Sequence, residues 1–83
     1  MNYVYILECS DGTLYTGYTN NLGKRISTHN KGKGAKYTRG RLPVKLIYFE
    51  EYVLKGDALH REFIIKKMSR QNKLNLIKNC QRL

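Results

Sequence analysis

The sequence predicts an α+β fold in which a small, three-stranded and mainly antiparallel sheet is flanked by helices in the order ββαβαα. Three observations predict it: two adjacent β-rich runs with a turn signal between them, a third such run near mid-chain, and three segments with helical caps or apolar spacing. The 83 residues leave room for one hydrophobic core, so we expect a single domain over residues 1–83. Because so small a domain hides only about 60% of its unfolded surface, an open groove is a more natural site than a deep pocket.

Strands are predicted where β-branched and aromatic residues cluster. Residues 1–9 and 13–18 form two such runs, and residues 44–52 form a third. The first two runs are separated by a Ser-Asp-Gly turn signal, and so short a link predicts a hairpin.

The register of this hairpin decides which side chains meet. A three-residue loop with Gly12 in the left-handed conformation pairs Tyr5 with Gly17. Leu7 is then opposite Tyr15. Directly opposed residues share a face, so this register places Tyr5 and Tyr15 together on one side of the sheet. A two-residue loop would place them on opposite faces, and we expect the three-residue loop.

Helices are predicted from caps and apolar spacing. The first covers residues 22–31, after capping asparagines, and is followed by a glycine-rich basic loop at 31–41. The second runs from residue 56 or 57 to residue 68, with an aspartate at its positive end. Ser69 can cap the third, which extends to about residue 80 and carries Leu74 and Ile77 inward.

The net charge indicates a polyanionic partner. Sixteen Lys and Arg residues against six Asp and Glu residues give a charge of +10, above the roughly 2–8 charges that keep a small domain soluble. For one compact domain this balance points first to nucleic acid, ahead of membrane surfaces or acidic proteins. Cys9 and Cys80 form no disulfide framework or metal-binding motif, and no signal sequence or membrane-spanning run is visible. We therefore expect a reduced, cytoplasmic location.

Arg25 and His29 are candidates for phosphate chemistry. They are four residues apart on the predicted helix and flank the apolar pair Leu22 and Ile26, at the edge of the buried stripe. From there a guanidinium and an imidazole can face a bound phosphate. The alternative is a solvated basic helix edge.

Glu62 is a candidate metal ligand. It is near the centre of an apolar arc on the second long helix, formed by Ala58, Leu59, Phe63 and Ile65. Carboxylates are rarely buried unless they are paired or bind a metal, and one carboxylate with waters and phosphate oxygens commonly holds Mg²⁺. The alternative is an i,i+4 ion pair with Lys66.

Two further groups have candidate roles. If the hairpin has the expected register, Tyr5 and Tyr15 bring two phenols to one spot, where a neighbouring cation can lower a phenol pKa enough to activate water. Simple aromatic packing is the alternative. The basic loop offers phosphate contacts and one aromatic ring for stacking, or else is only a mobile surface loop. Its candidate nucleic-acid-binding residues are Lys31, Lys33, Lys36, Tyr37, Arg39 and Arg41.

In order along the chain, these residues resemble the GIY-YIG nuclease superfamily. Its two tripeptides correspond to Tyr3-Val4-Tyr5 and Tyr15-Thr16-Gly17, and Arg25, His29 and the later Glu62 complete the pattern. The resemblance covers about the whole chain. It is greatest to the small single-domain UPF0213, or YhbQ-like, group, which has a similar basic loop and a similar IKKMSRxxK segment.

The resemblance implies a one-metal hydrolysis of DNA phosphodiester bonds. Glu62 would ligate Mg²⁺ or Mn²⁺, Arg25 would stabilise charge on the phosphate oxygens, and His29 would assist proton transfer. Either Tyr5 or Tyr15 would orient or deprotonate the attacking water, and Gly17 would leave room for the backbone. The alternative function is a non-catalytic DNA- or RNA-binding module.

The chain departs from the family pattern in four ways. Tyr3 replaces the glycine of the first tripeptide, and Tyr18 stands where some relatives carry a lysine. Many members use an asparagine of the last helix, and here Asn72 and Asn75 bracket its expected place as auxiliary candidates. Members commonly rely on a second domain for target choice, so a protein partner is expected to supply it here.

Overall fold

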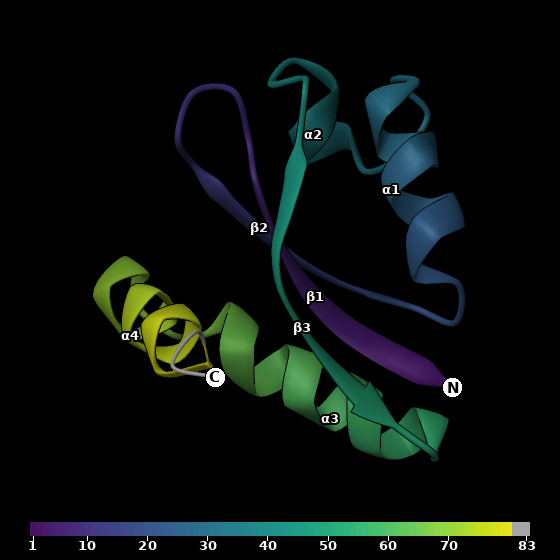
Figure 1. Ribbon diagram of the computed structural model, residues 1–83, viewed down its shortest axis with the longest axis vertical. Helices are drawn as coiled ribbons and strands as arrows, with labels where there is room; N and C mark the ends of the chain where they lie inside the picture. The colour runs from purple at the N-terminus through teal and green to yellow at the C-terminus, as the bar shows by residue number, and fades with distance from the viewer. Residues whose placement is uncertain (81–83) are drawn as a thin grey trace.

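The computed structural model describes residues 1–80 of the chain, which form one three-stranded sheet and four helices (Figure 1). The elements in order are β1 (Asn2–Glu8), β2 (Leu14–Thr19), α1 (Leu22–Asn30), α2 (Lys36–Arg39), β3 (Lys45–Tyr52), α3 (Lys55–Lys66) and α4 (Arg70–Cys80). The predicted α+β class and the order of the long elements are confirmed. Among these described elements, no helix is both long enough and apolar enough to span a membrane.

The sheet is antiparallel throughout, with strand order β2-β1-β3. Gly12 has a φ of 82°, and the Cys9 amide donates to the carbonyl of Thr13 across a three-residue loop. Tyr5 is therefore opposite Gly17, as predicted. Because β1 is the central strand, its side chains on both faces are buried.

The two faces of the sheet pack against different elements. On one face, Val4 and Ile6 pack against Ala58 and Ile65 of α3 and Ile77 of α4. On the other face, the buried strand residues pack against α1 and the segment before β3. The residues of this second cluster include Tyr5, Leu7, Leu22, Ile26, Leu42 and Val44. The sheet thus separates two small cores, and α1 and α3 lie on opposite sides of it (Figure 1).

The inward faces of α3 and α4 differ in part from the prediction. Leu59 and Phe63 are 41% and 56% exposed, and Leu74 is 37% exposed. Only one stripe of a helix can face the sheet, and on α3 that stripe contains Ala58 and Ile65, two turns apart. Phe63 instead lies beneath the Lys67 ammonium, 4.1 Å from its ring centroid. The prediction that Leu74 points inward was wrong, whereas Ile77 is buried as expected.

The segment 31–41 was predicted to be a loop throughout, but part of it forms the short helix α2. Thr38 of α2 is fully buried, and its hydroxyl donates to the carbonyl of Ala35. Glycine and lysine content favours a loop, but here a tertiary contact of Thr38, described below, holds one helical turn in place.

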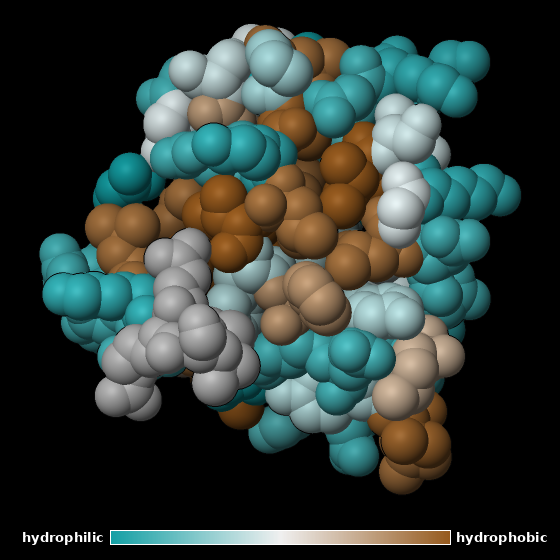
Figure 2. All heavy atoms as spheres, viewed as in Figure 1, coloured by the Kyte–Doolittle hydropathy of each residue, from teal (hydrophilic) through white to brown (hydrophobic). Residues whose placement is uncertain are grey.

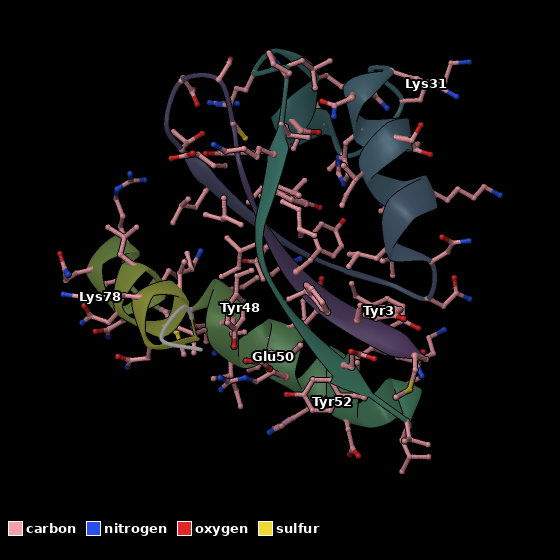
Figure 3. The ribbon with its side chains drawn as sticks, in the orientation of Figure 1. Tyr3, Lys31, Tyr48, Glu50, Tyr52 and Lys78 are labelled. Atoms are coloured by element: carbon pink, nitrogen blue, oxygen red, sulfur yellow. The ribbon has the colours of Figure 1, made fainter. Side chains whose placement is uncertain are left out.

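A partly buried carboxylate holds α3 against β3. Glu50 accepts hydrogen bonds from the hydroxyls of Tyr48 and Tyr52, and from both Nε and Nη2 of Arg61 at 2.9 and 3.1 Å. In Figure 3, Glu50 lies between the two tyrosines beside α3. Burial alone would raise the pKa of Glu50, but the hydrogen bonds from Arg61 and the tyrosines outweigh it and hold the pKa below its usual value.

One face of the molecule carries exposed apolar groups. Figure 2 shows apolar side chains gathered along the middle of this face, over β3, with hydrophilic residues around them. Phe49 of β3 is 42% exposed and packs edge-on against Tyr3. Cys9 does not belong to this exposed group, because it is buried, and its thiol is free.

Candidate active site

The candidate site is built around the Tyr5 side chain, which β1 places under α1. Tyr5 is only 1% exposed, and its ring lies directly over Gly17 of the neighbouring strand. A Cβ atom at position 17 would come within 2.4 Å of the Tyr5 hydroxyl oxygen. Gly17 therefore makes room for this phenol, rather than for the backbone of a bound strand.

The Tyr5 hydroxyl forms a buried hydrogen bond with His29. The two atoms, Oη and Nε2, are 2.9 Å apart, and His29 is completely buried at the last turn of α1. Its other ring nitrogen, Nδ1, is 2.9 Å from the Thr38 hydroxyl. The imidazole thus connects a strand of the sheet to α2.

The hydrogen-bond directions assign a tautomer to His29. The Thr38 hydroxyl donates its proton to the carbonyl of Ala35, so it must accept from Nδ1–H of the imidazole. Nε2 is then unprotonated and accepts from the Tyr5 hydroxyl. Burial lowers the pKa of His29, and the nearby Arg25 charge lowers it further, so the ring is held in its neutral form.

Gly34 and Thr38 are two site residues that the sequence analysis missed. A Cβ at position 34 would lie 2.3 Å from Nδ1 of His29 and 2.9 Å from its Cα, so only glycine allows the segment to close over the ring. The sequence signal was a glycine and a threonine, five and nine residues after the histidine, in a basic stretch. Gly34 and Thr38 can be recognised as site residues only once His29 is known to be buried.

The charges of Arg25 and Glu62 both affect the pKa of the Tyr5 phenol. Burial raises the pKa of Tyr5, interaction with the Arg25 guanidinium lowers it, and the charges of Tyr15 and Glu62 raise it. Arg25 belongs to α1 and Glu62 to α3, so charges from helices on opposite faces of the sheet both influence the pKa of Tyr5.

Glu62 is mostly buried, with 18% of its side chain exposed; of the apolar arc predicted around it, Ala58 and Ile65 are buried, whereas Leu59 and Phe63 are exposed. Oε2 of Glu62 is 3.2 Å from Nζ of Lys66, so the i,i+4 ion pair considered above is present. No group of three acidic, histidine or cysteine side chains capable of enclosing a metal occurs in residues 1–80. A single carboxylate nevertheless suits Mg²⁺, which commonly keeps its waters and shares one carboxylate with substrate phosphates.

Tyr15 extends the cluster toward the surface. Its ring is edge-on to His29 at 5.4 Å and is stacked on Tyr37 of α2 at 5.9 Å. The Arg41 guanidinium lies 4.1 Å from the centroid of the Tyr37 ring and also pairs with Asp11. Tyr37 and Arg41 are therefore engaged within the protein, unlike the neighbouring cations. Lys31, Lys33, Lys36 and Arg39 are exposed, and Lys31 projects from the end of α1 (Figure 3).

Two shallow depressions flank the cluster. The first, the α1 depression, has a volume of about 230 Å³ and includes Lys24 and Arg25 in its lining. The second, the β2 groove, has a volume of about 360 Å³ and is lined by Leu14, Tyr15, Thr16, Tyr37, Lys66 and Lys73. Each contains one member of the cluster, Arg25 or Tyr15. Both are open to solvent, as expected for so small a domain.

The auxiliary asparagines lie outside this arrangement. Asn72 and Asn75 are exposed on α4, and the Asn75 amide oxygen accepts a hydrogen bond from Gln71. The residue between them that lines the β2 groove is Lys73.

The structure is thus a small three-stranded α+β domain in which the central strand and α1 hold Tyr5 and His29 in a buried hydrogen bond. Residues 1–75 match the GIY-YIG catalytic domain, and the chain belongs to this family of nucleases. The family assignment accounts for the two tripeptides, since they supply Tyr5, Tyr15 and Gly17.

Within the family, the chain is similar to UPF0213 proteins. It is 65% identical to one from Clostridium perfringens, with 93% of this chain and 83% of the relative covered, and 56% identical to one from Bacillus licheniformis, with 98% and 84% covered. The solution structure of a UPF0213 protein from Bacillus halodurans is also similar. Its TM-score is 0.62 at 49% identity, covering 94% of this chain and 84% of that one.

Proposed function

We propose that this protein is a divalent-metal-dependent endonuclease that hydrolyses DNA phosphodiester bonds. The observation that carries the proposal is the hydrogen bond between the Tyr5 hydroxyl and the neutral His29, at a phenol whose pKa is also influenced by the charges of Arg25 and Glu62. A proton acceptor can activate the attacking water, a cation can stabilise charge on the phosphate, and a carboxylate can hold a divalent metal ion.

The neutral His29 can accept a proton during the attack of water on the phosphate. A water held by the tyrosines attacks phosphorus and transfers a proton to the Tyr5 oxygen, while the Tyr5 proton moves to Nε2 of His29. The hydrogen bond of Nδ1 to Thr38 keeps the imidazole oriented for this transfer. Because burial lowers the pKa of His29, the imidazolium is short-lived and returns its proton readily.

Charge on the phosphate is balanced from both sides of the sheet. Arg25 stabilises the non-bridging oxygens as negative charge develops on them. Glu62 would hold Mg²⁺ or Mn²⁺ together with the substrate, and the ion would supply Lewis-acid stabilisation of the leaving oxygen. Tyr15, which lines the β2 groove, orients the water from its exposed side. A protein partner is proposed to supply target choice.

The test is incubation of the purified protein with single-stranded, duplex and branched DNA, with and without Mg²⁺ or Mn²⁺. We expect metal-dependent products that are lost in Glu62→Ala and Arg25→Ala. Lys78→Gln, an exposed substitution on α4, is the control and should cleave like the wild type. Cleavage that persists in both site variants would come from a contaminant and would refute the proposal.

A second candidate is a non-catalytic DNA- or RNA-binding module, favoured by the +10 charge and the four exposed cations of residues 31–39. Such a module would bind nucleic acid in a salt-sensitive manner, without product and without regard to metal. Calorimetric titration with Mn²⁺ separates the two functions. A specific site that is abolished by Glu62→Gln supports the enzyme, and its absence supports the module.

A further inference from the structure

The β2 groove contains a pair of lysines that the proposed chemistry does not use. Lys66, near the end of α3, and Lys73, on α4, line the groove together. Lys73 is half-buried, and within residues 1–80 it forms no ion pair. Burial lowers the pKa of Lys73, and the neighbouring charge of Lys66 lowers it further. A bound anion would offset the repulsion between the two ammonium groups.

The groove also adjoins the catalytic cluster. Tyr15 belongs to both, since its ring contacts His29 on one side and lines the groove on the other. A nucleic-acid strand whose cleaved phosphate lies at Tyr5 would therefore pass over Tyr15 and bring a neighbouring phosphate toward the lysines. Ammonium groups that neutralise backbone phosphates supply most of the sequence-independent affinity for nucleic acid.

We propose that the β2 groove is a binding site for a backbone phosphate of the substrate DNA strand, next to the phosphate that is cleaved, with Lys73 and Lys66 as its ligands. The identity of the strand rests on the proposed function, whereas the site itself does not. Tyr37 of the basic segment 31–41 also lines the groove, but the cations of the groove are different from those of that segment, because they come from α3 and α4.

Lys66 links this site to the carboxylate. Its ammonium is 3.2 Å from Glu62 while half of its side chain is exposed to solvent. The same ammonium cannot serve the carboxylate and a phosphate equally well. Replacing Glu62 with an uncharged side chain therefore releases Lys66 toward the groove, so binding of the phosphate is coupled to the Glu62–Lys66 ion pair.

The experiment measures binding of fluorescein-labelled oligothymidylate by anisotropy in EDTA, where hydrolysis cannot interfere. We expect Lys73→Gln and Lys66→Gln each to weaken binding about tenfold and to reduce the salt slope by about 0.7, the value for one lost contact to a single strand. Lys78→Gln removes the same charge from an exposed position of α4, labelled in Figure 3, and should change affinity less than about twofold. Thermal unfolding of each variant verifies that it is folded.

A double-mutant cycle tests the coupling. Glu62→Gln should tighten binding in EDTA, and this gain should disappear when it is combined with Lys66→Gln. If Lys73→Gln and Lys78→Gln weaken DNA binding equally, the proposed phosphate site in the β2 groove is refuted, because the loss would then be a general charge effect. If no DNA is cleaved, but Lys73→Gln weakens binding and Lys78→Gln does not, the proposed endonuclease function is refuted and the phosphate-binding site in the β2 groove is supported. If Glu62-dependent cleavage occurs and Lys73→Gln binds DNA like Lys78→Gln, the phosphate-binding site in the β2 groove is refuted and the endonuclease function is supported.

Discussion

The Tyr5 hydroxyl and Nε2 of His29 are 2.9 Å apart in the interior of the domain, although the two residues are separated by 24 positions in the sequence. Each partner is held from a second side: Gly17 lies against the phenol, and Gly34 lies against the imidazole. The geometry of the pair therefore depends on two positions where any side chain would collide.

The first prediction concerns these glycines. Gly17→Ala should displace the Tyr5 ring, because the new Cβ would lie 2.4 Å from its hydroxyl, and should cost about 1–3 kcal/mol as overpacking does. Gly34→Ala should cost more, because it also meets the His29 backbone at 2.9 Å. Gly23→Ala is the control: it faces open space on α1 and should stabilise the protein by about 0.5–1 kcal/mol. Urea unfolding measures all three, and a Gly17→Ala variant as stable as Gly23→Ala would contradict the predicted packing.

The second prediction concerns the protonation of His29. Nitrogen-15 NMR at pH 6.5, the ordinary imidazole pKa, should show a neutral ring with its proton on Nδ1. Because its folded pKa is lowered, the unfolded chain takes up this proton first as the pH falls below about 6.5, and the stability contributed by the neutral ring is then lost. The exposed His60 provides an internal comparison. A charged or Nε2-protonated His29 at this pH would refute the relay to Tyr5.

The third prediction concerns Glu50. Glu50→Gln should destabilise the fold by about 1–3 kcal/mol at neutral pH, because it weakens charged hydrogen bonds to Arg61 and the two tyrosines. The folded pKa of Glu50 is lowered, so its contribution is present above the ordinary value of 4.5 and is lost as the pH falls through the folded pKa. Melting temperatures of the wild type and Glu50→Gln should therefore converge in acid. Glu51→Gln, on the exposed side of β3, should have little effect at any pH.

The fourth prediction uses two threonines of β2. The Thr16 hydroxyl is buried, and among the described residues it has no hydrogen-bond partner, so Thr16→Val should stabilise the protein by about 1 kcal/mol. Thr19 is also buried, but its hydroxyl donates to the Asn21 carbonyl and accepts from the Asn21 amide. Thr19→Val should therefore destabilise. Chemical denaturation that ranks the two variants in the reverse order would show that Thr16 has a partner in the folded protein.

Local signals in the sequence were sufficient to predict the hairpin. One glycine with a left-handed conformation determined the loop length, and the loop length determined that Tyr5 and Tyr15 share a face. Helical spacing singled out Glu62 and the family resemblance implied its role as a metal ligand, but its position relative to Tyr5 depends on how α3 crosses the sheet. No local pattern contains that crossing.

The contacts of His29 could not be predicted in the same way. A four-residue helix has too little periodicity to be recognised, and α2 is held by the bond of Thr38 to an imidazole nine residues earlier. Hydropathy likewise could not decide which apolar stripe of α3 faces the sheet. Leu59 and Phe63 are as apolar as the buried residues, and only the packing of Ala58 and Ile65 excludes them.

The closure of the segment 31–41 over His29 has a consequence for how this chain can be altered. The exposed lysines that would grip a nucleic acid are carried on the same short stretch as Gly34 and Thr38. Exchanging that stretch to retarget the protein would therefore also disturb the imidazole beneath it. Attempts to redesign substrate preference should graft only the outward-facing positions and keep the glycine and the threonine unchanged.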